Sequence, residues 1–193
     1  MKSPEPMTSR VSSGHNLRCR LAAWWNGWAA ALLVGMLGVF AVATEARAQL
    51  RVGEAMPALA DFALEGDGAS APTVGRVVVL DFWASWCAPC KASFPMLGAL
   101  QREWGAEGVT VIGVSVDEKK SAYDGFLSRL KPPFVTAWDA QQRLVKRVRV
   151  PKMPTTYIVD RRGVVRFIHE GFHGDSTERR LRAHVRQLLE EGR

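Results

Sequence analysis

Cysteine is scarce in this chain of 193 residues, and its scarcity excludes one large class of small proteins. Only three cysteines are present, at positions 19, 87 and 90. That is too few for a fold that disulfide bridges hold together. Cys87 and Cys90 are separated by two residues, whereas Cys19 lies alone near the N-terminus. The sulfur chemistry of this chain therefore depends on one pair of neighbouring thiols.

The sequence also lacks a concentrated basic surface. The net charge is +7, and residues 1–48 carry +3 of it. In the remainder the signs are interspersed, and no basic stripe alternates with aromatic residues as nucleic-acid binding requires. We therefore expect no nucleic-acid partner. Internal repeats and low-complexity tracts are absent too, and the length suits one compact domain with a short extra segment.

The N-terminal 48 residues have the pattern of an export segment. Arg18 and Arg20 precede a long apolar stretch at 21–43. The sequence Ala46-Arg47-Ala48 follows, and small-x-small sequences of this kind are typical of signal-peptidase sites. A basic flank, an apolar core and a cleavage site together predict export across a membrane.

We accordingly predict a signal peptide or membrane anchor over 1–48 and one folded domain over 49–193. Cleavage near Ala48 would release a soluble periplasmic domain. The stretch 21–43 is also long enough to cross a bilayer, so an uncleaved anchor in the inner membrane stays open. In both cases the positive-inside rule places the domain outside the cytoplasm.

Beyond the export segment, hydrophobic patterning predicts alternating strands and helices. Strands are expected at 77–81, 109–116, 155–159 and 164–168, and helices at 90–104, 119–130, 140–148 and from Ser176 onward. A short strand at 61–64 and a capping role for Ser176 are further expectations. Strand, helix and strand in succession make a βαβ unit with parallel strands. The pattern predicts an α/β fold, a mixed sheet with helices on both faces.

The central cysteine pair follows a buried strand directly. The apolar run Val77 to Leu80 ends in Asp81, and Cys87-Ala88-Pro89-Cys90 comes six residues later. This arrangement is typical of two thiols delivered to the start of a helix. At or near the N-cap, unpaired amide groups and the helix dipole favour a thiolate. We therefore expect Cys87 to be the nucleophile and Cys90 to resolve the mixed disulfide.

Three other uses of the cysteine pair compete with redox chemistry. A zinc site needs two more ligands, and we interpret His169, His173 and His184 as ordinary surface or hydrogen-bonded histidines. A structural disulfide this short closes too small a loop to stabilise much. A peroxidatic cysteine does not need an adjacent partner within a Trp-Cys-x-x-Cys sequence. We predict a redox-active disulfide between Cys87 and Cys90, and no metal.

Asp81 is the second candidate for chemistry. An acid at the end of an apolar strand is expected to be buried, and burial raises the pKa of a carboxyl group. From its position before Cys87, Asp81 could exchange protons with Cys90 through water. A solvated strand end or a paired structural acid is the alternative interpretation.

Two further features surround the pair in the sequence. Trp83 is expected in the core, whereas Trp86, next to Cys87, is expected on a surface where partners dock. Pro154 stands directly ahead of a predicted strand. A cis bond in a tight turn and an ordinary trans proline both fit that position.

Two separated motifs carry a family resemblance. Residues 81–91, Asp-Phe-Trp-Ala-Ser-Trp-Cys-Ala-Pro-Cys-Lys, with Pro95 following, resemble thioredoxin. Residues 111–118, Val-Ile-Gly-Val-Ser-Val-Asp-Glu, and 153–160, Met-Pro-Thr-Thr-Tyr-Ile-Val-Asp, are similar to the exported TlpA/ResA-like branch. Because both motifs occur in the same order, the resemblance covers about residues 50–190.

The resemblance implies a thioredoxin fold with a helical insert between its βαβ and ββα halves. It implies an exposed nucleophile at Cys87, a resolving thiol at Cys90 and a cis Pro154 lying against the disulfide. Met153 would offer its backbone to an extended partner peptide. The expected substrate-binding residues are Trp86, Ala88, Pro89 and Met153.

Members of this branch typically act outside the cytoplasmic membrane as thiol reductants that a membrane electron donor supplies. Their targets include apocytochromes c and copper-site cysteines. We therefore predict an exported thiol–disulfide oxidoreductase that reduces extracytoplasmic protein disulfides without a cofactor. A disulfide-introducing oxidase and a dithiol copper-binding chaperone are the alternatives. Two positions depart from the branch: Ser93 replaces a common glutamate, and Asp81 replaces a common asparagine.

Overall fold

The computed structural model describes residues 49–192, so the predicted export segment lies outside the described residues. A five-stranded sheet runs through the described part of the chain in the order β3-β2-β1-β4-β5. Its strands are β1 (Val77–Trp83), β2 (Val109–Ser115), β3 (Val135–Trp138), β4 (Thr155–Val159) and β5 (Val165–Glu170). The central strand β1 pairs in parallel with β2 and antiparallel with β4. The predicted mixed sheet is confirmed.

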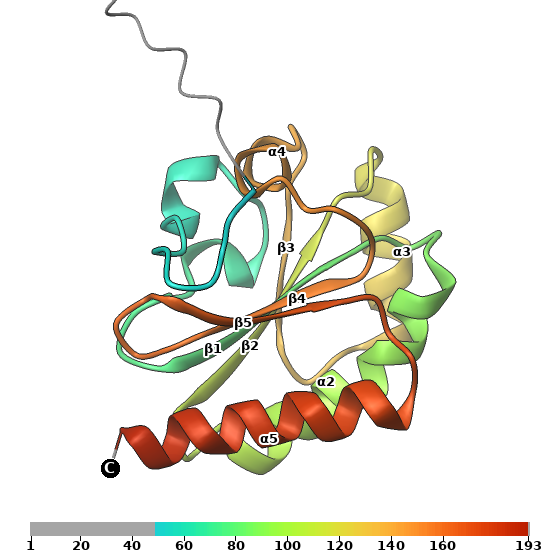
Figure 1. Ribbon diagram of the computed structural model, residues 1–193. Helices are drawn as coiled ribbons and strands as arrows, with labels where there is room; N and C mark the ends of the chain where they lie inside the picture. Colours follow the sequence, from blue (N-terminus) through green and yellow to red (C-terminus); the bar gives the residue numbers. More distant parts are fainter. Residues whose placement is uncertain (1–48, 193) are drawn as a thin grey trace, which may run out of the picture. The chain divides into compact units, whose positions relative to one another are not determined.

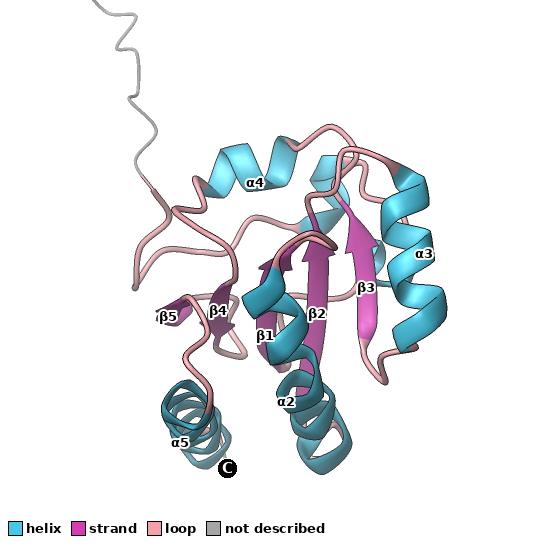
Figure 2. Ribbon diagram, turned by 90° about the vertical axis from the view of Figure 1, so that its right-hand side faces the viewer, coloured by secondary structure: helices cyan, strands magenta, loops and turns pink. Residues whose placement is uncertain are grey.

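Helices cover both faces of this sheet. They are α2 (Ala88–Trp104), α3 (Lys120–Leu130), α4 (Arg143–Val148) and α5 (Asp175–Glu191), and two 3-10 helices, η1 (Leu59–Phe62) and η2 (Asp67–Ser70), precede them. Figure 1 views the sheet nearly edge-on, with α2 and α5 on one side and α4 on the other. Figure 2 shows α3 beside β3. The insert between β2 and β4 therefore contains an edge strand as well as the predicted helices.

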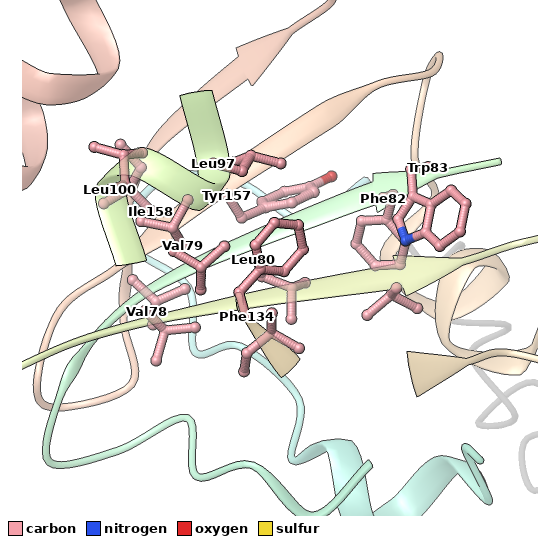
Figure 3. Packing of buried hydrophobic residues seen from close by; sticks show 14 of the residues in the cluster. Val78, Val79, Leu80, Phe82, Trp83, Leu97, Leu100, Phe134, Tyr157 and Ile158 are labelled. Carbon is pink, nitrogen blue, oxygen red and sulfur yellow. The ribbon is translucent and has the colours of Figure 1, made fainter. Parts of the chain in front are cut away.

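The strand β1 is buried along its whole length and supplies side chains to both layers of the core. Asp81 and Trp83 are two residues apart, so they project from the same face of the sheet. Trp83 packs on that face against Phe94 of α2, at 5.0 Å between ring centroids, and against Phe126 of α3, at 4.8 Å. Figure 3 shows Trp83 among the apolar residues of β1, β4 and α2. Asp81 therefore lies on the face that α2 covers.

The short strand predicted at 61–64 is not present. This part of the chain forms η1, in which Leu59 is buried and Ala63 closes the turn with a φ of 50°. Four residues offer too few alternating positions to define a strand without a neighbour to pair with. Packing of Leu59 into the core decides the local structure instead.

The last helix begins one residue earlier than the predicted cap. Gly174 is the N-cap of α5, with a φ of 61° that glycine adopts without strain. Ser176 lies in the first turn, where its hydroxyl donates a hydrogen bond to the carbonyl of His173 at 3.1 Å. The predicted capping role of Ser176 is therefore wrong, because the glycine conformation sets where the helix starts.

Candidate active site at the start of helix α2

The cysteine pair occupies the first turn of α2. Cys87 is the N-cap residue in extended conformation, and its Sγ accepts a hydrogen bond from the amide of Cys90 at 3.2 Å. Pro89 lies in the first turn, where its missing N–H leaves no helix hydrogen bond unmade. The predicted position of Cys87 at the N-cap is confirmed. A thiolate there faces the positive end of the helix dipole.

A disulfide bond joins the two cysteines, with an S–S distance of 2.04 Å. Cys90 is completely buried and only 5% of Cys87 is exposed, so the exposed nucleophile that the resemblance implies is instead buried in the disulfide form, and Cys87 is only slightly more accessible than Cys90. Ala88 and Pro89 are exposed beside it, and 69% of Trp86 is exposed. The disulfide therefore lies just beneath a surface that these three residues provide.

The loop between β1 and Cys87 is anchored to the end of β2. The buried carboxylate of Asp117 accepts hydrogen bonds from the amide of Ser85 at 3.1 Å and from its hydroxyl at 2.9 Å. A third comes from the hydroxyl of Ser115 at 2.8 Å. Asp117 thus fixes the backbone two residues before the nucleophile. Sequence reasoning gave Asp117 no role, although it belongs to the motif at 111–118.

Pro154 follows a cis peptide bond from Met153. It is buried, and its carbonyl accepts a hydrogen bond from the amide of Gly171 at 2.7 Å. Thr155 lies opposite Phe82 in the antiparallel β1–β4 pair, so Pro154 lies at the end of the sheet where β1 leads to the cysteines. Met153 beside it is half-buried. The cis bond that the resemblance implies is present at the expected position.

Asp81 is completely buried and nearly isolated from other polar groups. Its Oδ1 accepts a hydrogen bond from the hydroxyl of Thr156 at 2.6 Å, while Oδ2 has no hydrogen-bond partner among the described residues. Burial raises the pKa of Asp81 from 3.8 to about 7, and the bond from Thr156 opposes this rise. The expectations of burial and a raised pKa are therefore met. A carboxyl group of this kind can take up or release a proton near neutral pH.

Thr156 is a second residue that sequence reasoning missed. It lies directly opposite Asp81 across the β1–β4 pair, 75 residues away in the sequence. On the other side of Asp81 is Gly113 of β2, which has no side chain. Among residues 49–192, Thr156 therefore supplies the one side-chain hydrogen bond to the acid. The available signal was a threonine near the start of a strand whose later residues are Tyr157, Ile158 and Val159.

Ser93, one of the two departures from the resemblance, brings no charge to the cysteine helix. It is buried, and its hydroxyl donates a hydrogen bond to the carbonyl of Cys90 at 2.8 Å. That hydroxyl is thus engaged with the helix backbone. The charge that can change near Cys90 belongs to Asp81 on β1.

The three histidines of the domain fall into two environments. His173 lies exposed in a loop, whereas His169 of β5 is buried and hydrogen-bonded to His184 of α5. Within residues 49–192, no group of three or more His, Cys, Asp or Glu side chains is placed to hold a metal ion. No helix in the same range has the length and apolar character needed to span a membrane.

Comparison with known proteins places this arrangement in a family. The AhpC/TSA family matches residues 52–168. The chain belongs to this family. Within it, the thiol-disulfide oxidoreductase ResA of Oceanobacillus iheyensis is 33% identical over 129 residues, which cover 63% of this chain and 66% of that protein. The chain therefore spans about two thirds of the length of that relative.

Two further relatives agree with this assignment. ResA of Bacillus thuringiensis is 26% identical over 141 residues, covering 72% of this chain and 80% of that protein. The crystal structure from Chlorobium tepidum assigned as thiol:disulfide interchange protein DsbE has a TM-score of 0.67 and 33% identity, covering 73% of this chain and 99% of that one. The chain is a TlpA/ResA-like member of the thioredoxin family, a thiol–disulfide oxidoreductase of the ResA/DsbE type.

Proposed function

We propose that this protein reduces disulfide bonds of partner proteins outside the cytoplasm, with Cys87 and Cys90 as the dithiol. The observation that carries the proposal is the Cys87–Cys90 disulfide at the N-cap of α2, at the same end of the sheet as the cis Pro154. The identity to ResA and DsbE proteins supports the reaction class. The order of events follows from the positions of the two sulfurs.

In the dithiol form, the Cys87 thiolate attacks one sulfur of a partner disulfide, and the other partner sulfur leaves as a thiolate. Cys90 then transfers its proton to the Asp81 carboxylate. The Cys90 thiolate attacks the Sγ of Cys87, which forms the Cys87–Cys90 disulfide and releases the second partner thiolate. Two electrons have passed to the partner. A thiol donor in the membrane would restore the dithiol.

Partner proteins would dock on the surface around the disulfide. Trp86, Ala88 and Pro89 are exposed there, and a large exposed indole is a common anchor in protein interfaces. Met153 precedes the cis bond at the start of β4, where an extended peptide could pair with its backbone. These residues form the proposed substrate-binding surface.

Insulin reduction tests the proposal directly. We expect Cys87→Ser to abolish turnover, because no thiolate remains to attack the partner disulfide. Cys90→Ser should instead accumulate a mixed disulfide between Cys87 and insulin, visible as a mass increase that dithiothreitol reverses. Substituting Cys90 in this way keeps the nucleophile and serves as the matched control. Full insulin reduction by Cys87→Ser would contradict the proposal.

The reduction potential decides the direction of electron flow. A value near that of thioredoxin, about −270 mV, supports a reductant, and one near that of DsbA, about −120 mV, supports a disulfide-introducing oxidase. Equilibration with glutathione buffers gives this value. Stoichiometric retention of copper(I) without turnover would favour the copper chaperone instead.

Export and the identity of the client belong to the same proposal. The basic flank, the apolar stretch 21–43 and the Ala-x-Ala sequence support export to the periplasm, with release near Ala48 or retention in the inner membrane. Apocytochromes c and copper-site cysteines are the proposed clients. Fusing residues 1–48 to a reporter enzyme that is active only outside the cytoplasm tests the location, and an inactive reporter would contradict export.

A further inference from the structure

A row of polar side chains crosses the face of the sheet that α2 covers. Asp81 of β1 lies opposite Thr156 of β4, and Thr156 lies opposite His169 of β5. Directly opposite residues of antiparallel strands project their side chains on the same face. The neighbouring row on this face is apolar throughout: Val79, Ile158 and Phe167. The polar row is therefore a local exception within an apolar layer.

Hydrogen bonds fix both ends of the row. The hydroxyl of Thr156 donates to Oδ1 of Asp81 at 2.6 Å, and Nε2 of His169 lies 3.0 Å from Nδ1 of His184 on α5. Asp81, Thr156 and His169 are buried, whereas His184 is half-buried. The row therefore begins in the core beneath the cysteine helix and ends at the surface of α5.

No direct hydrogen bond joins Thr156 to His169 among the described residues, so this step of the row needs a bridging water molecule. Cβ atoms of directly opposite residues lie about 4.5–5.5 Å apart. Because Nε2 of His169 faces His184, its Nδ1 is the nitrogen left for the hydroxyl of Thr156. One water molecule bound between that nitrogen and the hydroxyl would complete the step.

The reaction creates a need for such a route. Asp81 accepts the proton of Cys90 while the partner protein is still attached to Cys87. A docked partner covers the exposed residues around the disulfide, and water reaches Asp81 poorly from that side. We propose that Thr156, His169 and His184 form a proton relay that connects Asp81 with solvent at helix α5 during this stage. The relay rests on the proposed function.

The proton balance of the relay is simple. Protonated Asp81 gives its proton to the hydroxyl oxygen of Thr156, whose own proton passes to the bridging water. That water gives one of its protons to Nδ1 of His169. The proton on Nε2 of His169 moves to Nδ1 of His184, and the proton on Nε2 of His184 leaves to water. One proton enters and one leaves, and no group is oxidised or reduced. The row is reset when the Thr156 hydroxyl rotates back and both imidazole rings return to their first tautomers.

The surroundings of His169 and His184 lower their pKa values, which suits groups that transfer a proton without keeping it. Burial lowers the pKa of His169 to about 4, with further lowering by His184 and by Arg180 of α5. Burial and then Arg180 also lower the pKa of His184. Glu170 follows His169 on β5 and so projects to the opposite face, where Lys152 pairs with it at 3.7 Å. On α2 the charged groups are Lys91, Arg102 and Glu103, and Glu103 pairs with Arg182 of α5. Both imidazoles are therefore neutral at neutral pH, each with one ring N–H.

Comparison of two substrates tests the relay. Insulin covers the cysteine side when it docks, whereas the small hydroxyethyl disulfide leaves that side open to water. We expect His169→Phe to slow single-turnover insulin reduction at pH 7 by about tenfold. A positioned proton-transfer group contributes about 100-fold or more to a rate. The loss is smaller here because Asp81 can still release its proton slowly to water on the cysteine side. The rate with hydroxyethyl disulfide should be unchanged. His184→Phe interrupts the same row at its surface end and should behave alike.

Matched variants separate the relay from packing. Thr156→Ser keeps the hydroxyl and should retain the wild-type rate with insulin, whereas Thr156→Val should slow it. His173→Phe, in the exposed loop, should change neither rate. Equal rates for wild type and His169→Phe with insulin, or equal slowing with both substrates, would overturn the relay alone. A wild-type protein that reduces neither substrate would contradict the proposed function, and with it the relay.

Discussion

The carboxyl group of Asp81 binds its proton more tightly in the folded chain than in the unfolded one. Its pKa is raised from 3.8 to about 7, first by burial. Between these values the folded chain retains a proton that the unfolded chain has released. The stability linked to this proton is therefore fully present below about pH 4, and it is lost as the pH rises through 7.

Replacing this acid with an uncharged isostere should remove the pH dependence. We expect Asp81→Asn to unfold with the same free energy as wild type at pH 3, where both side chains are neutral in the folded and the unfolded chain. At pH 8 the variant should be more stable, by up to about 4 kcal/mol, because three pKa units correspond to that free energy. Urea unfolding at both pH values measures the difference. A variant less stable than wild type at pH 8 would show that the buried carboxylate is not destabilising.

At the scale of elements, the contact between the β1–α2 loop and the end of β2 positions the nucleophile. Asp117 accepts hydrogen bonds from both Ser85 and Ser115 in a buried setting. We expect Asp117→Ala to lower the free energy of unfolding by about 1–3 kcal/mol, because buried donors lose their partner. Hydrogen exchange at the amide of Ser85 should accelerate.

A surface acid provides the control for this substitution. Asp124 of α3 pairs with Lys120 at 2.9 Å, and both side chains are about half exposed. Asp124→Ala should change the free energy of unfolding by about 0.5 kcal/mol or less. Equal effects of the two substitutions would contradict a special role for the Asp117 contact.

Elements with strong local signals could be predicted from the sequence, and those that depend on distant pairing could not. The strands β1 and β2 are continuous apolar runs, and α2 has helical spacing between them. The strand β3 has four residues, between Pro133 and Asp139, and it exists because β2 pairs with it in parallel. Nothing in so short a stretch indicates such a partner.

The same limit applies to the site. Local spacing defines the motifs that contain four of the site residues, so the sequence alone could mark them as candidates for the active site: Cys87, Cys90, Asp81 and Pro154. Thr156 reaches Asp81 only because β4 pairs with β1, and Asp117 reaches Ser85 from 32 residues away. Contacts between residues so far apart in the sequence depend on the register of strands, which hydrophobic pattern alone does not set.

At the scale of the whole molecule, the disulfide contributes little to the fold. It joins residues three positions apart, and closing so small a loop restricts the unfolded chain only slightly. We expect reduction to lower the free energy of unfolding by about 2 kcal/mol or less. Denaturant unfolding with and without dithiothreitol measures this, and unfolding of the domain on reduction alone would contradict it.

The hydrogen bond between Thr156 and Asp81 joins positions 75 residues apart, and this separation has a consequence for the growing chain. Synthesis proceeds from the N-terminus, so both cysteines leave the ribosome well before Pro154 and Thr156 exist. During that interval the thiols react as those of an ordinary peptide, with neither a buried acid nor Pro154 beside them. Control over the sulfurs therefore begins only when β4 is added to the sheet, late in folding.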